Sequence, residues 1–478
     1  DVMKYNNLGA GSIYDKPESS ATQWSLMSYL ARINYSLYDR YLFSVNGRVD
    51  GSSRFGGNNK YGFFPSGSVA WRISEEGFME PVKAVINNLK LRTSYGFTGN
   101  TEIGVYESLA TLGSNSWTIG NQLVSGFYPN RIPNPDLKWE KTGQFDIGFD
   151  LGLFNNRLRL TADYYYKKTT DLLYNVAIPS ASGYDSMLKN IGSVQNKGYE
   201  LSIESDNLSG AFSWTTAFNI SFNRNKVLEL GGETYKDVGT YDDHLKTSDI
   251  RRLIVGQPIG VFYGYRFDGI FQNEAECAQQ TSSPSPIGVG LRRYKDLNGD
   301  GKIDATNDRE ILGDANPKFF GGMTNTFAYK GFELNVFLQY SYGNKIFNYN
   351  AMELESPTGG QNVYQDLVNR WTPTNPSNEY QKATTNRNNI VSDRFIEDGS
   401  FLKLKTVSLS YSFPKLNWKH IGGLRLYVTG QNLLTWTKYR GYDPEVSYRG
   451  ASTLEAGEDF GGYPQARTFM FGIKLDIK

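Results

Sequence analysis

Alternation of apolar and polar side chains is the dominant pattern along the chain. From Phe212 to Asn223, apolar residues occupy one side of an extended strand, and serine, threonine and asparagine occupy most of the other. Two further segments, 144–154 and 157–168, repeat the pattern with ionised side chains on the polar side. Such segments are typical of antiparallel strands with one wet face.

The same alternation recurs along the chain and predicts about thirteen strands, most near the length that a tilted strand needs to cross a bilayer. These strands are expected at Met27–Leu37, Tyr41–Asp50, Val69–Ile73, Leu89–Phe97, Gln144–Phe154, Arg157–Lys168, Tyr199–Glu204, Phe212–Asn223, Phe319–Tyr329, Phe332–Tyr342, Phe401–Phe413, Leu424–Gln431 and Phe469–Ile477. In Phe401–Phe413 the phase slips near Lys405 and Thr406, which predicts a β-bulge.

The connections between these strands alternate between short and long. Short ones are Leu37–Arg40, Asn155–Asn156 and Lys330–Gly331, whereas the long ones cover about 97–138, 169–192, 224–318, 343–400 and 432–465. This asymmetry predicts an all-β transmembrane antiparallel barrel, with short periplasmic turns and long extracellular loops. A set of soluble β-sandwiches is the structural alternative.

The direction of the strands leads to an expectation about completeness. If Leu37–Arg40 is periplasmic, the first and last predicted strands both run inward, although bacterial barrels normally have an even number of strands. We therefore expect residues 1–478 to be the C-terminal part of a barrel, with earlier strands upstream. Asp1–Asn7 has no signal-peptide pattern.

Composition narrows the possible functions. Aromatic residues make up 14% of the chain, and a net charge of +1 argues against nucleic-acid binding. The single cysteine, Cys277, excludes an internal disulfide, and two histidines, His244 and His420, offer little for catalysis or zinc binding. No apolar run is long enough for a transmembrane helix, and the mean hydropathy is −0.49.

Several phrases resemble the SusC/RagA family of TonB-dependent outer-membrane transporters, and they extend over nearly the whole chain. They are Tyr61–Arg72, Leu89–Asn100, Asn134–Trp139, Tyr294–Asp304, Gly313–Gly322, Arg370–Pro376, Asp393–Ser400 and Gly430–Glu445. The resemblance implies a nutrient importer for oligosaccharides or peptides, not an enzyme, with a barrel of about twenty-two strands in the cell outer membrane.

The resemblance also implies partners. A plug domain would fill the barrel, and a SusD-like surface lipoprotein, the lid, would cover its extracellular opening. TonB would act on the plug. We expect the plug and the TonB-binding segment upstream of Asp1. The chain departs from the usual pattern of outer-membrane barrels because it ends at Leu475–Lys478 without a terminal aromatic residue.

One loop matches the first half of a calcium-binding loop. Oxygen ligands alternate along it, and the sixth position is glycine, as calcium loops require. The candidate positions are Asp296, Asn298, Asp300, Lys302 and Asp304. The twelfth position is Asn307, with Asp308 beside it, so the usual bidentate acid is displaced; the alternative is an Asp/Gly-rich turn without a metal.

Two further groups are candidates for binding or catalysis. Aromatic residues of the long connections could contact cargo or the lid, or simply pack within the loops: Trp117, Tyr128, Trp371, Tyr380, Trp436 and Tyr439. Charges of the polar strand faces could form a general acid–base pair, but a self-paired, hydrated barrel wall is the favoured interpretation: Asp146, Asp150, Arg157, Arg159, Asp163, Lys167, Glu200 and Glu204.

The sequence alone leaves two rival functions open. A secreted all-β protein that binds or cleaves glycans would show similar alternation, with its apolar rows buried between sheets. A passive porin would share the barrel without the plug.

Overall fold

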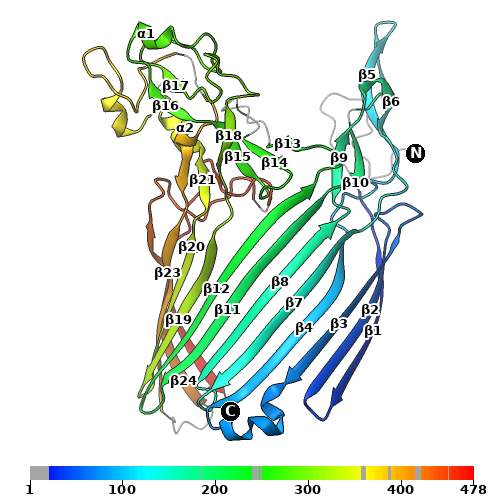
Figure 1. Cartoon of the computed structure of the whole chain (residues 1–478), viewed down its shortest axis with the longest axis vertical. Coiled ribbons are helices and arrows are strands. Elements are labelled where there is room, and N and C mark those ends of the chain that lie inside the picture. Colours follow the sequence, from blue (N-terminus) through cyan, green and yellow to red (C-terminus); the bar gives the residue numbers. More distant parts are fainter. Residues whose placement is uncertain are drawn as a thin grey trace.

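A computed structural model of the chain describes residues 21–184, 186–239, 247, 250–356, 362–385, 389–414, 421–450 and 452–477. Its main element is a thirteen-stranded antiparallel sheet in the order β1-β2-β3-β4-β7-β8-β11-β12-β19-β20-β23-β24-β26 (Figure 1). Its strands are β1 (Leu26–Leu37), β2 (Tyr41–Ser52), β3 (Tyr61–Arg72), β4 (Ile86–Asn100), β7 (Glu140–Leu153), β8 (Leu158–Thr170), β11 (Ser193–Leu208), β12 (Phe212–Glu229), β19 (Phe319–Tyr329), β20 (Phe332–Tyr342), β23 (Phe401–Ser412), β24 (Ile421–Thr437) and β26 (Thr468–Ile477). The thirteen predicted strands are confirmed.

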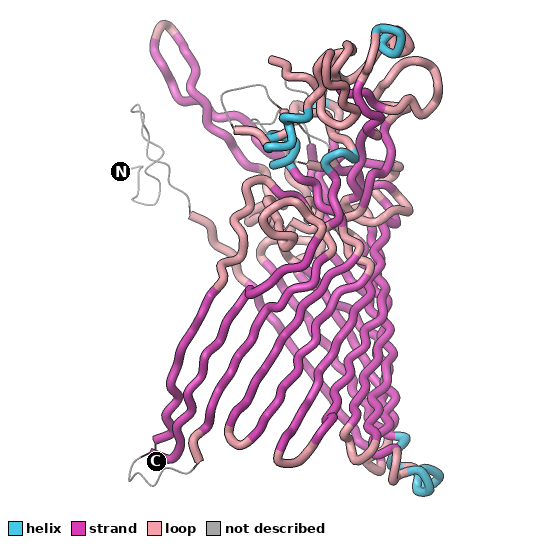
Figure 2. The backbone as a smooth tube through the Cα atoms, turned by 90° about the vertical axis from the view of Figure 1, so that its left-hand side faces the viewer, coloured by secondary structure: helices cyan, strands magenta, loops and turns pink. Residues whose placement is uncertain are grey.

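The sheet is curved, and its strands are tilted against its long axis (Figure 2). The connections after β1, β7, β11 and β19 are short and lie at one end, here called the turn end, where the C-terminus also lies (Figure 1). The long connections rise from the opposite end, here called the loop end. No helix among the described residues is both long and apolar enough to cross a membrane.

The tight turns follow from local backbone chemistry. Lys330 and Gly331 both have positive φ, 47° and 89°, which is the two-residue hairpin geometry that matches strand twist. Phe154, Asn155 and Asn156 also have positive φ, so the turn between β7 and β8 holds four residues rather than the two predicted.

The two faces of the sheet differ as the alternation predicts. On one, here called the apolar face, cross-strand pairing joins apolar side chains into a row that crosses six strands. The row consists of Trp214, Phe327, Leu334, Leu409, Val428 and Phe471. The opposite, polar face carries most of the ionised residues of β7, β8 and β11, among them Asp146, Asp163 and Glu200.

The predicted bulge lies in β23. Leu404 pairs with Leu338 and Thr406 with Phe337, so Lys405 has no opposing residue on β20. The β23–β24 register shifts at the same place. The extra residue explains the slip of phase in the sequence.

The long connections contain more regular structure than the alternation predicts. They contribute β5 (Thr111–Ile119), β6 (Gln122–Arg131), β9 (Leu173–Ala177), β10 (Ser186–Asn190), β13 (Tyr235–Val238), β14 (Arg251–Ile254), β15 (Val261–Tyr265), β16 (Phe267–Ile270), β17 (Arg292–Tyr294), β18 (Arg309–Gly313), β21 (Lys345–Asn348), β22 (Ile396–Asp398) and β25 (Glu458–Asp459). Short helices include α1 (Glu274–Cys277) and α2 (Tyr349–Leu354), and 3-10 helices cover Ile73–Glu75, Gly77–Val82, Ser180–Ser182, Gln365–Asn369 and Asp393–Phe395.

One predicted strand covers only part of the observed strand. The expected strand Val69–Ile73 is the second half of β3, which begins at Tyr61, and Ile73 already belongs to a 3-10 helix. Gly62 lies against the ring of Phe64, and Pro65 interrupts the alternation, so the first half of β3 has no clear period. His244, His420 and the chain ends Asp1–Asn7 and Lys478 lie outside the described residues.

Candidate functional site at the loop end

Three long connections combine into one folded body at the loop end, here called the loop assembly: the described parts of 230–318, 343–400 and 438–467 (Figure 1). Its core joins residues from different connections, because Phe262 packs against Phe347 at 6.1 Å and Phe347 against Phe395 at 6.4 Å between ring centroids. All three rings are fully buried. The three connections therefore share one packed core rather than forming separate loops.

Ion pairs to two buried carboxylates, those of Glu355 and Glu458, fix how the three connections meet. Arg251 Nε lies 2.9 Å from Glu458 Oε1, and both side chains are buried. Glu355 accepts from Arg394 at 2.8 Å and from Arg440 at 3.1 Å. Such pairs add little net stability. Removing one partner, however, leaves the other charge buried and unpaired, at a cost of about 3–5 kcal/mol. The pairs therefore favour one arrangement of the connections.

A second anchor joins the assembly to the sheet itself. Lys403 on β23 is 1% exposed, and its Nζ lies 2.6 Å from both Asp443 Oδ1 and Glu445 Oε2. Burial is the largest single influence and would raise the pKa values of Asp443 and Glu445. The hydrogen bonds and charge of Lys403, together with backbone N–H groups at Asp443 and Lys405 at Glu445, outweigh it and lower both pKa values. The segment around Asp443 is thus held against the polar face of the sheet.

A cavity of about 450 Å³ lies where the loop assembly meets the ends of β12, β19 and β20. Asn225, Asn316, Lys318, Lys345 and Asp398 are among its lining residues. Its amides and charges can form hydrogen bonds with a polar solute, and the Ser400 hydroxyl in its lining donates to Asp398 Oδ1 at 2.6 Å.

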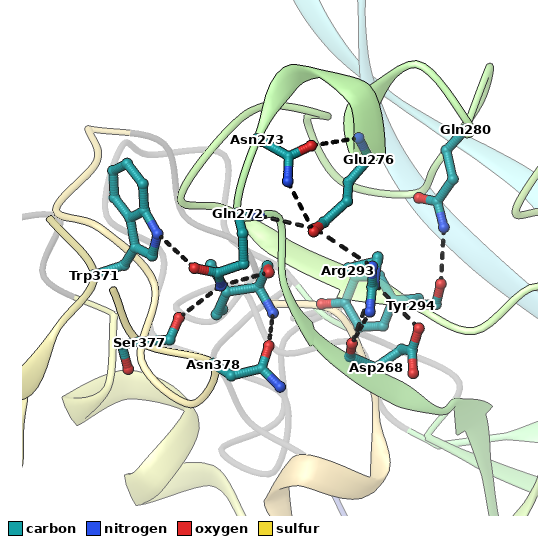
Figure 3. Close-up of polar contacts among 11 residues, drawn as sticks. Asp268, Gln272, Asn273, Glu276, Gln280, Arg293, Tyr294, Trp371, Ser377 and Asn378 are labelled. Carbon is teal, nitrogen blue, oxygen red and sulfur yellow. Dashed lines mark hydrogen bonds and ion pairs between the residues drawn. The ribbon is translucent and has the colours of Figure 1, made fainter. Parts of the chain in front are cut away.

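The most distant part of the assembly is cross-linked by polar contacts (Figure 3). Trp371 donates its indole N–H to Gln272 Oε1 at 3.1 Å, and Gln272 in turn donates to the carbonyl of Ser377 at 3.0 Å. Asn378 accepts from the backbone N–H of Ile270 at 2.9 Å. These bonds tie the segment 371–378 to the connection that follows β16.

The family of the chain follows from comparison with known proteins. The family model "TonB dependent receptor-like, beta-barrel" matches residues 2–433. The chain belongs to the TonB-dependent receptor family. Its place is accordingly the outer membrane, and the resemblance to SusC and RagA is confirmed.

Relatives of this receptor support the same assignment. It is 41% identical to TonB-dependent receptor P3 of Formosa agariphila over 99% of this chain and 48% of that protein. It is 32% identical to TonB-dependent receptor SusC of Bacteroides thetaiotaomicron over 96% of this chain and 44% of that protein. The chain thus spans about half the length of the curated relatives that it matches.

Among solved structures, this receptor is similar to the RagAB peptide transporter, with a TM-score of 0.80 and 27% identity. The match covers 98% of this chain and 49% of that one. The similarity supports the placement of the thirteen strands as part of a TonB-dependent barrel.

In this receptor, side-chain oxygens of the candidate calcium loop accept hydrogen bonds from the loop's own backbone N–H groups. Asp296 accepts from the N–H groups of Gly299 and Gly301 at 2.6 and 2.7 Å, and Asp304 accepts from those of Thr306 and Asn307. Asn298 and Asp300 likewise accept from Asp300 and Lys302. Among the described residues, no three acidic, histidine or cysteine side chains cluster as a metal site. The geometry is that of an Asp/Gly-rich turn, and calcium binding there stays a prediction.

The six candidate aromatic residues do not form one site. Tyr380 and Tyr439 are buried, and the Tyr439 hydroxyl donates to Asp459 at 2.5 Å. Burial and that hydrogen bond raise the pKa of Tyr439. Trp371 is held as described above, whereas Trp117 and Tyr128 are exposed on the β5–β6 hairpin.

Trp436 differs from the other candidates because it lies in a membrane-spanning strand. It pairs with Leu402 on the apolar face near the loop end. Half of its surface is exposed, at 51%. A tryptophan there suits the boundary between lipid and water, so contact with cargo is the less favoured role for it.

The charges of the polar face pair with one another, as the wall interpretation predicts. Arg92, which the sequence reasoning missed, lies 2.7 Å from Asp163, 3.5 Å from Asp150 and 3.7 Å from Asp146. A further pair joins Arg159 to Glu204 at 3.0 Å.

The remaining wall residues have simpler surroundings. Arg157 donates to backbone carbonyls, including that of Asp206 at 3.1 Å. Lys167 lies 5.0 Å from the ring of Tyr165, and Glu200 is the cross-strand neighbour of Asp163. The parity of Leu89–Phe97 could have identified Arg92, because it puts Arg92 on the polar side.

Proposed function

We propose that the chain forms the larger part of the barrel of a TonB-dependent importer that takes up oligosaccharides or peptides. The observation that supports this most is the thirteen-stranded sheet, with a continuous apolar row on one face and paired charges on the other. A wall of this kind separates lipid from a wet interior. The family of the chain is one of transporters and receptors, and no catalytic step is part of the proposal.

Further segments complete the importer in this proposal. Among the described residues no pairing joins β1 to β26, and an unpaired strand edge in hydrocarbon costs several kcal/mol for each free backbone group. The relatives are about twice as long as the chain, which leaves room for more strands and a plug. TonB would act through that plug.

A SusD-like lipoprotein is the proposed lid. The loop assembly offers it a support, because ion pairs to buried carboxylates hold three connections in one arrangement. The exposed Trp117 and Tyr128 are further proposed contacts with lid or cargo. The cavity lined by Asn225, Asn316 and Lys345 is a proposed place for the polar groups of cargo.

Deletion of the complete receptor gene tests the function. We expect loss of growth on an oligosaccharide or peptide mixture as sole carbon source, with unchanged growth on the corresponding monomers. Separate glycan and peptide media identify the cargo class, since the related RagAB is named a peptide transporter. Normal growth of the deletion strain on both kinds of oligomer, in a strain with no second receptor of this type, would refute the proposal.

Affinity purification of the tagged receptor from outer membranes tests the lid. We expect a surface lipoprotein in stoichiometric amount after mild detergent extraction. Recovery of the receptor with full uptake activity but without any lipoprotein would contradict this part.

A further inference from the structure

Four cations gather on the apolar face of the sheet, where a membrane protein normally presents apolar side chains to lipid. Cross-strand pairing places Lys197 beside Arg224, and Gln195 between Lys168 and Lys226. We call Lys168, Lys197, Arg224 and Lys226 the basic patch. All four are exposed, and among the described residues none of them forms an ion pair with a carboxylate.

The patch sits at the loop end, just beyond a row of aromatic rings. Tyr164 and Tyr199 lie 5.0 Å apart between centroids, and Tyr199 pairs with Phe222 in the next strand. Arg224 and Lys226 follow Phe222 on the same face of β12. Aromatic residues mark the depth of the membrane interface, so the basic patch lies at the level of the lipid headgroups.

The distribution of charge on this face is one-sided. Toward the turn end the apolar-face positions of β8, β11 and β12 hold residues such as Leu160, Ile203 and Trp214. The only acid on this face of the three strands is Glu229, at the extreme end of β12. Solubility alone would not require cations at only one end of this face. The position of the basic patch is better explained by an anionic partner at the loop end.

Further barrel strands and a plug are poorly placed to cover the patch, and within the described residues Arg224 donates to the backbone carbonyl of Lys318 at 3.0 Å. β8, β11 and β12 are interior strands of the sheet, far from its edge strands β1 and β26. Further barrel strands would join at those edges, and a plug would lie against the polar face. The face that carries the patch therefore stays turned toward the membrane.

We propose that the basic patch binds the phosphorylated headgroup of an outer-leaflet glycolipid. Strand spacing of about 4.8 Å and a rise of about 3.4 Å per residue place the backbones of the four cations within roughly 12 Å of one another. That spacing suits a headgroup with two phosphates, each held by charge-assisted hydrogen bonds from Lys or Arg. The acyl chains of the same lipid would lie over Tyr164, Tyr199 and Phe222.

This inference goes beyond the proposed function, since it depends on the outer-membrane location and not on the cargo or on TonB. The test uses the full-length receptor in nanodiscs that contain diphosphoryl lipid A and phosphatidylcholine, with native mass spectrometry to count bound lipid. We expect the wild type to retain lipid A selectively. The variant K168Q/K197Q/R224Q/K226Q should lose about fivefold in apparent affinity for each charge removed, with a smaller effect of the patch at high salt.

A matched control removes four exposed cations elsewhere, in K60Q/K189Q/K295Q/R370Q, and should retain lipid A as the wild type does. Equal retention by the basic-patch variant, or equal binding of dephosphorylated lipid A, would overturn the proposal. Displacement of bound lipid A by millimolar inorganic phosphate would assign the patch to soluble anions and would also overturn it. Photo-crosslinks from position 197 to a polypeptide instead of lipid would do the same. Growth on the cargo is measured separately, so failure here leaves the proposed function standing.

Discussion

Lys403 and Asp443 form an ion pair of 2.6 Å in which the lysine is almost completely buried. Lys403 belongs to a strand of the sheet and Asp443 to the last long connection, so this one contact fixes a loop to the barrel wall. Glu445 accepts from the same ammonium group and also from Lys405, the bulged residue of β23. The bulge therefore places a second cation beside the first.

We expect Lys403→Met to release this loop. Asp443 and Glu445 would lose their shared buried partner, at a cost of about 3–5 kcal/mol. Limited proteolysis within residues 438–467 and thermal unfolding of the receptor measure the effect. Lys405→Met is the control: Lys405 is more exposed, and Glu445 keeps Lys403, so its cost should stay below about 1 kcal/mol. Equal effects of the two variants would contradict the anchor.

The contact of Asp443 and Glu445 with Lys403 should also weaken at low pH. The pKa values of Asp443 and Glu445 are lowered in the folded receptor, chiefly by Lys403 acting against burial. Their stabilisation is complete above the unfolded pKa values of about 3.9 and 4.3 and is lost as pH falls through the lower folded values. Proteolysis of the loop should therefore be equally slow at pH 7 and about pH 5, and should accelerate only below about pH 4. Faster proteolysis of the loop already between pH 7 and pH 5 would show that groups other than Asp443 and Glu445 control its attachment to the sheet.

The strands could be predicted from sequence because each one separates two solvents. Lipid and water impose a period of two on every strand, and even the slip at Lys405 was visible. The loop assembly could not be predicted in this way. Phe262 and Phe347 share one core although they are far apart in the chain, and no local period reveals such contacts.

Among the candidate site residues, too, those on strands could be predicted from the sequence and those in the loops could not. The charges of the polar face could be predicted as a self-paired wall, because strand parity places them on one side. For loop aromatics the sequence gives residue type but not burial. For Tyr439 the sequence leaves cargo contact and loop packing both open, and only the tertiary fold shows that it is enclosed beside Asp459.

The hairpin between β19 and β20 should depend on Gly331. Its φ is 89°, and a Cβ at this position would lie 2.7 Å from the carbonyl oxygen of Ser412. Gly331→Ala should therefore cost at least about 1 kcal/mol and lower the unfolding temperature of the receptor. Gly57→Ala is the matched control, since φ there is not positive and a Cβ would meet nothing within 4 Å. A Gly331→Ala receptor as stable as the control would show that the turn tolerates a side chain.

Leu334 tests the assignment of the two faces most directly. It pairs with Phe327 and Leu409 within the apolar row, whereas its neighbour Asn335 points to the polar face beside Thr326 and Ser408. Arginine facing hydrocarbon costs about 2–4 kcal/mol at the bilayer midplane and less toward the membrane surfaces, whereas arginine toward a wet interior costs little. Leu334 is the third residue of β20, so its cost should lie below the midplane value. We therefore expect Leu334→Arg to reduce the folded fraction more than Asn335→Arg does. Heat-modifiable migration on gels, with membrane-extracted receptor, measures both. A larger loss for Asn335→Arg than for Leu334→Arg would mean that the apolar row faces the interior of the barrel and the polar face contacts lipid.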